Sequence, residues 1–166
     1  MVATYQFCET TGTGSVDATG IANGNWGAVD ATGIDITIDA NKINISGNSY
    51  SKYIFGAFTG TYSQIGPNGK LWMSAGTLPT GCYVMAITRS GFAAPTVTTT
   101  GTDAIPTVEG SALTVLFGSS HAAATGTTTT AVTGYSNYYR SQLQTSANAP
   151  VGAIGAVTIT LKHDEN

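Results

Sequence analysis

The sequence has 166 residues, the length of one domain, and only 9% of them are charged, against roughly 25% in an ordinary soluble domain. Its six Lys and Arg residues are scattered among nine acidic ones, which argues against a nucleic-acid partner, because such binding needs clustered positive charge. No apolar run approaches the roughly 20 residues that span a bilayer as a helix, so no membrane partner is expected.

The N-terminal segment Met1–Cys8 alternates from Thr4 onwards, which predicts a short strand within an extended arm that adds to a neighbour's sheet. The beginning of the chain, MVATYQFCETTGTG, lacks the basic region, apolar stretch and cleavage site of a secretory signal. We therefore expect a chain that is made and kept in a cytoplasm or released by lysis. Cys8 and Cys82 are then expected to be reduced, buried thiols, and a single disulfide between them is the alternative.

A hexapeptide, VDATGI, occurs twice, at residues 16–21 and 29–34. In each copy an aspartate precedes a glycine by three positions, which is typical of a turn whose carboxylate accepts local backbone N–H groups. Asp17 and Asp30 could also offer oxygens to calcium. A calcium loop needs about six to eight oxygens at closer spacing, so no metal site is expected.

The clearest alternation in the sequence runs over residues 34–39, with isoleucines on one face and polar residues on the other. The pattern returns at residues 43–46 after a turn, which predicts a β-hairpin. Asp35 and Asp39 would then lie on one strand face about 13 Å apart, farther than the paired carboxylates of a glycosidase. We therefore interpret them as solvated surface charges.

The densest run of aromatic residues lies in the middle of the first half of the chain. Over Tyr50–Thr61 both alternating faces carry apolar groups, so this strand is expected to be central and covered on both sides. Pro67-Asn68-Gly69 is typical of a turn, after which residues 70–74 return as the second strand of a hairpin. Trp72, within that hairpin, is expected to fill the core.

Further apolar stretches are predicted as strands: residues 82–88, 111–117, 135–145 and 155–161. Residues 90–109 and 118–130 are rich in Thr, Ala, Gly or Pro and are predicted as loops. The result is about eight to ten short antiparallel strands and no segment with a helical period. This pattern predicts a single all-β domain, residues 1–166, of the β-sandwich or jelly-roll class.

Catalytic motifs are scarce, and no enzymatic activity is expected. His121 follows two serines in a low-complexity loop, without the G-x-S-x-G turn of a serine hydrolase. The isolated cysteines and histidines do not make a zinc site, and no glycine loop for phosphates is present, so no cofactor is expected. Aromatic side chains remain as the candidate assembly-interface residues: Tyr5, Phe7, Trp26, Tyr138 and Tyr139.

Three segments of the sequence resemble small β-rich virion proteins of tailed bacteriophages. They are N-S-Y-S-K-Y-I-x-x-x-F-x-G from Asn48, K-L-W-M-S-A-G from Lys70, and S-N-Y-Y-R-S-Q-L-Q from Ser136. The resemblance implies a subunit of an oligomeric coat without enzymatic activity. It implies no active-site residues, because such proteins have none to carry over.

The low charge and the resemblance together predict a virion structural protein, in first place a capsid decoration or cement protein that stabilises a phage head by bridging capsomers. Its expected partners are copies of itself, as in a trimer, and the major capsid protein. A phage tail or fibre subunit and a subunit of an extracellular filament or surface layer are the alternatives. A third is a glycan-binding β-sandwich module in which an exposed ring such as Trp26 stacks on sugars.

Overall fold

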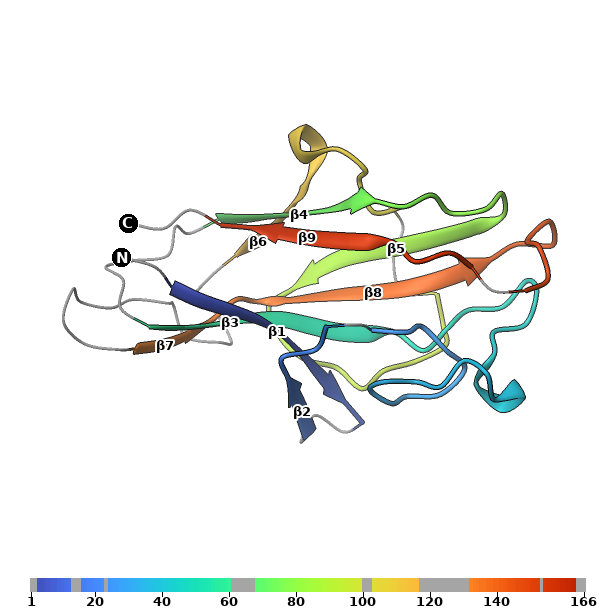
Figure 1. Cartoon of the computed structure of the whole chain (residues 1–166), viewed down its shortest axis with the longest axis horizontal. Helices are drawn as coiled ribbons and strands as arrows, with labels where there is room; N and C mark the ends of the chain where they lie inside the picture. Colours follow the sequence, from blue (N-terminus) through green and yellow to red (C-terminus); the bar gives the residue numbers. More distant parts are fainter. Residues whose placement is uncertain are drawn as a thin grey trace.

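The computed structural model describes residues 3–12, 16–22, 24–60, 68–99, 103–116, 132–152 and 154–163, and these form two antiparallel sheets (Figure 1). The architecture confirms the predicted all-β fold of the sandwich class. The strands are β1 (Ala3–Thr11), β2 (Val16–Thr19), β3 (Lys52–Gly60), β4 (Asn68–Ala75), β5 (Cys82–Arg89), β6 (Leu113–Leu116), β7 (Val132–Tyr135), β8 (Tyr138–Thr145) and β9 (Thr158–Lys162). Two short 3₁₀ helices accompany them, η1 (Asp39–Asn41) and η2 (Glu109–Ser111). No helix in the described part of the chain is both long and apolar enough to cross a membrane.

The larger sheet has the order β2-β1-β3-β8-β5, and β7 also pairs with β3. As predicted, β3 is central, and its residues 52–58 are buried on both faces. β8 pairs with the first part of β3 and β7 with its last part, because the strand predicted over residues 135–145 breaks at Ser136. Ser136 Oγ accepts the Gly56 N–H at 2.8 Å, and Gly56 O accepts the Ser136 N–H at 2.9 Å. The break therefore leaves these buried backbone groups satisfied.

The smaller sheet has the order β6-β4-β9. β3 and β4 thus belong to different sheets, and the predicted hairpin between them is wrong. Asn68 and Gly69 lie within β4 rather than in a turn, paired with Leu116 and Val115 of β6, while Pro67 lies outside the described residues. The apolar face of β4 is buried against the other sheet instead of against its sequence neighbour.

Two apolar clusters explain why β3 is buried on both faces. The main core lies between the sheets and includes Ile54 from the larger one and Leu71 and Leu161 from the smaller one. The second cluster lies on the outer face of the larger sheet, where Phe92 of the loop after β5 packs on Tyr53 with ring centroids 4.9 Å apart. Alternate residues of one strand therefore enter two different cores.

Residues 103–106 link β5, an edge strand of the larger sheet, to β4, the central strand of the smaller sheet. The Ile105 N–H donates to Val84 O in β5 at 2.8 Å, and the Met73 N–H in β4 donates to Pro106 O at 2.8 Å. Ile105 is itself buried in the main core. This short segment ties the two sheets together without being a regular strand.

Residues 34–46 contradict the predicted hairpin, because they form turns and helix η1 instead of strands. Asp35 Oδ1 accepts the backbone N–H of Thr37 at 2.9 Å and its hydroxyl at 2.6 Å, and the Asn41 side-chain amide donates to Asp35 O at 2.9 Å. Such local side-chain hydrogen bonds stabilise turns in competition with a strand ladder. The alternating isoleucines consequently do not share a core-facing strand face.

The predicted N-terminal arm is also corrected where the structure describes it. From Ala3 onwards, β1 pairs with β3 of its own sheet, and from Cys8 it also pairs with β2. The rings of Tyr5 and Phe58 lie 5.1 Å apart, so side chains follow the backbone into contacts within the chain. Residues 3–8 therefore belong to a strand of the chain's own sheet and are not a free arm.

Candidate functional site

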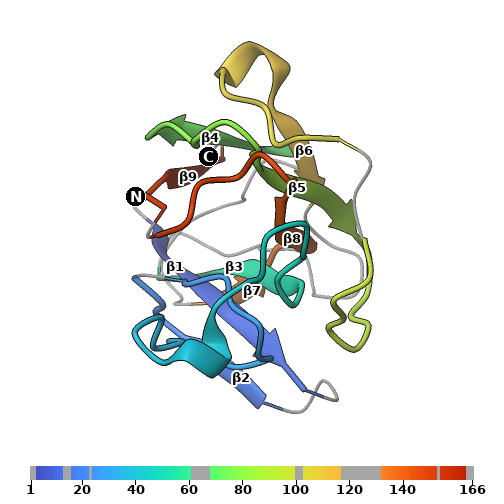
Figure 2. The ribbon, with the colours of Figure 1, turned by 90° about the vertical axis from the view of Figure 1, so that its right-hand side faces the viewer.

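A cleft of about 1100 Å³ opens between the two sheets, on the side of β1 and β9. Its walls come from β1, β3 and β8 of the larger sheet, from β9 of the smaller one, and from two segments without strands, residues 36–45 and residues 149–152 with 154–157. Figure 2 shows these two irregular segments on the side of the molecule that faces the viewer. The first contains turns and helix η1, and the second, which has no regular structure where it is described, leads from β8 of the larger sheet to β9 of the smaller one.

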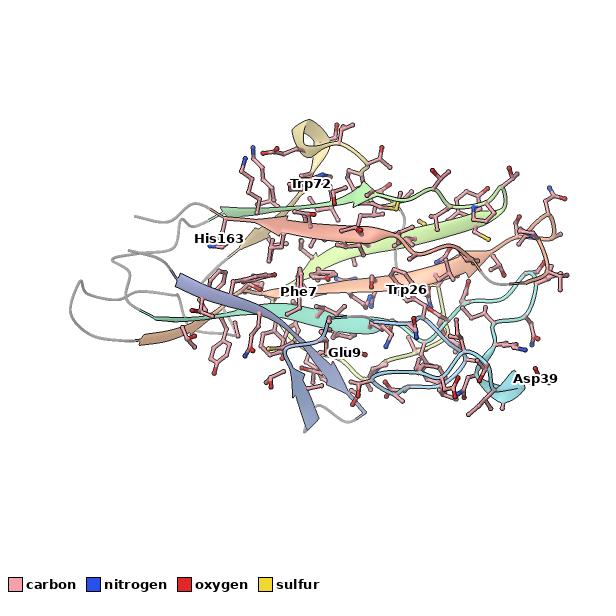
Figure 3. All side chains as sticks on the ribbon, viewed as in Figure 1. Phe7, Glu9, Trp26, Asp39, Trp72 and His163 are labelled. Carbon is pink, nitrogen blue, oxygen red and sulfur yellow. The ribbon has the colours of Figure 1, made fainter. Side chains whose placement is uncertain are left out.

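The inner end of the cleft is built from side chains on the inward face of adjacent strands. Ile54 of β3 pairs with Tyr139 of β8, and Lys52 lies two residues before Ile54 on the same face. Trp26 packs against this core, and its Nε1–H donates to Ser141 Oγ at 3.2 Å (Figure 3). The indole is therefore oriented by both apolar packing and a hydrogen bond.

The mouth of the cleft, by contrast, consists of exposed apolar side chains. Ile36, Ile45 and Val151 line the cleft and are 44%, 47% and 89% exposed. Ile36 and Ile45 come from the segment that was expected to be a hairpin with its isoleucines inward. Because that segment forms turns, two of its isoleucines face solvent at the mouth.

A buried ion pair lies at the inner end of the cleft. Lys52 Nζ is 2.6 Å from Glu9 Oε1 and 3.1 Å from Ala31 O, and the Lys52 and Glu9 side chains are only 5% and 2% exposed. Glu9 pairs with Ile54 in the register of β1 on β3, which places its side chain on the same inward face as Lys52. Glu9 Oε2 has no hydrogen-bond partner among the described residues. Removing two charges from water is costly, so each ion depends on the other.

Burial raises the pKa of the Glu9 carboxyl above its ordinary value, because apolar surroundings disfavour the charged form. Lys52 lowers the same pKa through its charge and its hydrogen bond, and the nearby charge of Asp30 raises it. Burial, and then the negative charge of Glu9, also raise the pKa of Tyr139. The Tyr139 hydroxyl therefore stays protonated and neutral beside the ion pair.

We expect Glu9 to make the free energy of unfolding fall as the pH rises from about 4.3, the ordinary pKa of a glutamate, through the raised pKa of the folded protein. In that window the folded protein binds more protons than the unfolded chain, so the contribution of Glu9 is complete at lower pH and is lost above it. Urea unfolding as a function of pH measures the effect. The Glu9→Gln variant, which does not titrate there, should lack this part of the slope; identical pH dependence in both proteins would contradict the prediction.

The five aromatic residues that were predicted to form an assembly interface lie in different environments in the structure. Phe7, Trp26 and Tyr139 line the cleft. Tyr138 and Tyr139 are only 6% and 3% exposed and pack in the outer and main cores, so neither is offered to a partner, which corrects that prediction. Tyr5 is half-buried among rings of its own chain. Consecutive residues of β8 enter different cores because both faces of the strand are covered.

Trp72 lies on the outer face of the smaller sheet and not in the core, contrary to expectation (Figure 3). Its neighbours Leu71 and Met73 are buried in the main core, so strand alternation places Trp72 on the opposite face. Lys70, two residues before Trp72 on the same face of β4, and Lys162 of β9 lie 3.7 Å and 2.7 Å from Glu109 Oε1 of helix η2. Trp72 is therefore only half-buried and takes no part in the cleft.

Within the described residues, no three His, Cys, Asp or Glu side chains are close enough to hold a metal ion together. Asp30 Oδ2 accepts the Gly12 N–H at 2.7 Å, a contact between residues 18 positions apart and not the local turn contact that was expected within each repeat. The side chain of Asp17 and the whole of His121 lie outside the described part. Cys8 and Cys82 are both buried and are not joined by a disulfide, which confirms the prediction of buried thiols.

The pairing of Glu9 with Lys52 is the part of the site that the sequence did not reveal. A lone charge in a strand is ordinarily solvated, so neither residue stands out by itself. The available signal was the position of Lys52 in a strand expected to be covered on both faces, where a charge needs a partner. That partner is 43 residues away in the sequence, and only the register of β1 on β3 identifies it.

A scan against protein-family models, a search of curated proteins and a search of solved structures each found no match to this chain.

Proposed function

We propose that the chain is a structural subunit of a virion, acting as a decoration or cement protein on the head of a tailed bacteriophage. The observation that carries the proposal is the mouth of the cleft, whose lining includes the exposed apolar side chains of Ile36, Ile45 and Val151. Apolar side chains grouped on a surface mark places that another protein covers. The small number of charged residues supports the same role, because charged groups are depleted at the cores of protein interfaces.

The mouth of the cleft replaces the N-terminal arm as the contact surface in this proposal. Residues 3–8 already pair with β3 of their own sheet, so they are not a free arm that extends to a neighbour. Trp26 is half-buried, and its N–H is bonded to Ser141, which disfavours the alternative in which an exposed indole binds a glycan. The proposed partners are copies of the chain, as in a trimer, and the major capsid protein. By contacting other copies of itself and the major capsid protein, the chain would bridge neighbouring capsomers.

Phage heads prepared without this protein are expected to lose heat resistance and to regain it when the purified chain is added back. The double variant Ile36→Asp/Val151→Asp should bind the heads at least about tenfold more weakly, because central apolar contacts carry most of the energy of an interface. Cosedimentation with the heads measures binding, and the temperature of DNA release measures heat resistance.

Val108→Asp is the matched control, because Val108 is 57% exposed but does not line the cleft. It should bind like the unmodified chain. Heads whose heat resistance does not depend on the protein would contradict the cementing role. Recovery of the chain with purified tails instead of heads would favour the tail or fibre alternative.

A further inference from the structure

We propose that the inner end of the cleft binds a small amphipathic molecule with an aliphatic body and one neutral, oxygen-bearing head group, such as a hydroxyl or a primary amide. The proposal is independent of the virion role, because it uses the buried residues at the inner end of the cleft and not its exposed mouth. It concerns Trp26, Lys52, Ile54 and Leu143, all of which line the cleft.

The size and lining of the cleft suit a ligand of this kind. Its volume of about 1100 Å³ is slightly larger than that of most small-molecule sites, which are commonly about 300–1000 Å³. Phe7, Trp26, Ile54, Leu143 and Ile154 line it and also pack in or against the main core. An aliphatic chain in contact with these side chains is removed from water, which is the main favourable contribution to its binding.

Lys52 provides the polar contact for the head group. An ammonium has three hydrogens to donate, and two of them are directed to Glu9 Oε1 and Ala31 O. No third hydrogen bond of Lys52 Nζ is present among the described residues, and Glu9 Oε2, the other oxygen of the paired carboxylate, also accepts none. Because Lys52 lines the cleft and its side chain is only 5% exposed, an acceptor oxygen on a ligand would satisfy this hydrogen in a site largely shielded from water.

The charge of the ion pair selects a neutral head group. Glu9 already neutralises Lys52, so a carboxylate on the ligand would be repelled by Glu9 and an alkylammonium by Lys52. Either ion would also lose its hydration on entering the cleft without gaining an unpaired counter-charge. A hydroxyl or an amide carbonyl supplies the acceptor oxygen at a smaller desolvation cost.

The test uses four decyl compounds that differ only in the head group: 1-decanol, decanamide, decanoate and decylammonium. The chain has two tryptophans, so the Trp72→Phe variant leaves Trp26, which lines the cleft, as the single fluorophore. Trp72 does not line the cleft, so this background variant should leave binding unchanged. Titration of Trp26 fluorescence at mildly alkaline pH, where decanoate and decylammonium are both charged, gives four dissociation constants.

We expect 1-decanol and decanamide to bind saturably, and both charged compounds to bind at least about tenfold more weakly. Glu9→Gln removes the negative charge that repels a carboxylate, so in this variant the affinity for decanoate should rise at least about tenfold relative to that for 1-decanol. Four equal dissociation constants, no saturable change with any compound, or an unchanged order in Glu9→Gln would overturn the proposal.

Circular dichroism and urea unfolding show whether Glu9→Gln is folded. If Glu9→Gln does not fold, the order of the four dissociation constants measured with the Trp72→Phe protein is by itself the test of the proposal. The outcome is separate from the test with phage heads, because binding of a decyl compound says nothing about binding to a capsid.

Discussion

Replacing Lys52 with alanine is expected to lower the free energy of unfolding by about 3–5 kcal/mol, measured by urea denaturation at neutral pH. The substitution leaves the Glu9 carboxylate 2% exposed with neither its 2.6 Å partner nor water around it. The remaining carboxylate must then take up a proton or open the structure, and both cost free energy. The truncation also removes aliphatic atoms of the lysine side chain from the inner end of the cleft.

Two controls distinguish the buried charge from simple loss of a contact. Lys42 pairs with Asp39 on the exposed surface, so Lys42→Ala should leave the unfolding curve nearly unchanged. The double variant Lys52→Met/Glu9→Leu removes both charges and keeps similar volume, so it should recover most of the loss. A double variant as unstable as Lys52→Ala would show that the loss comes from packing and not from the uncompensated carboxylate.

Leu71→Ala is expected to lower the free energy of unfolding by about 2–5 kcal/mol. Leu71 is 0% exposed and lies in the main core with residues from both sheets, including Ile54 and Tyr139. Its truncation leaves a cavity between the sheets, which the strand pairing around it cannot close. Thermal and urea unfolding measure the loss.

Trp72→Ala is the matched comparison, because it changes the next residue of the same strand on the opposite face. It removes a larger side chain, but that side chain is half-buried outside the main core, so we expect the smaller destabilisation of the two. A larger loss for Trp72→Ala would contradict the assignment of the two faces of β4. Because folding is measured, the comparison holds whatever the function of the protein.

Strand positions were largely predictable, since side chains on alternate faces leave a local period that needs no tertiary information. Residues 82–88 became β5, and the apolar run over Tyr50–Thr61 became the two-faced, central β3. The isoleucine alternation at residues 34–39 wrongly predicted a strand, because the Asp35 side chain forms a turn with Thr37. Periodicity records which side chains share a face but not the local hydrogen bonds that compete with a strand.

The candidate site was predictable only in fragments. Trp26 was predicted to be an interface residue because it is aromatic, and it does line the cleft. Tyr138 and Tyr139 were singled out for the same chemical reason, yet they are core residues, because exposure depends on what covers each face of β8. The cleft itself has no sequence signal, since it results from how two sheets and two irregular segments are arranged in space.

By itself, the amino-acid sequence determined an all-β chain, most of its strands, and a central strand that had to be covered on both sides. Local alternation and composition are sufficient for these features, because they depend on neighbouring residues. Only the tertiary structure decided that β3 and β4 join different sheets, that Ile36 and Ile45 face solvent, and that Lys52 meets Glu9. Each of these depends on which distant segments are paired and in what register, and the energy of a buried charge or an apolar face is set by those partners.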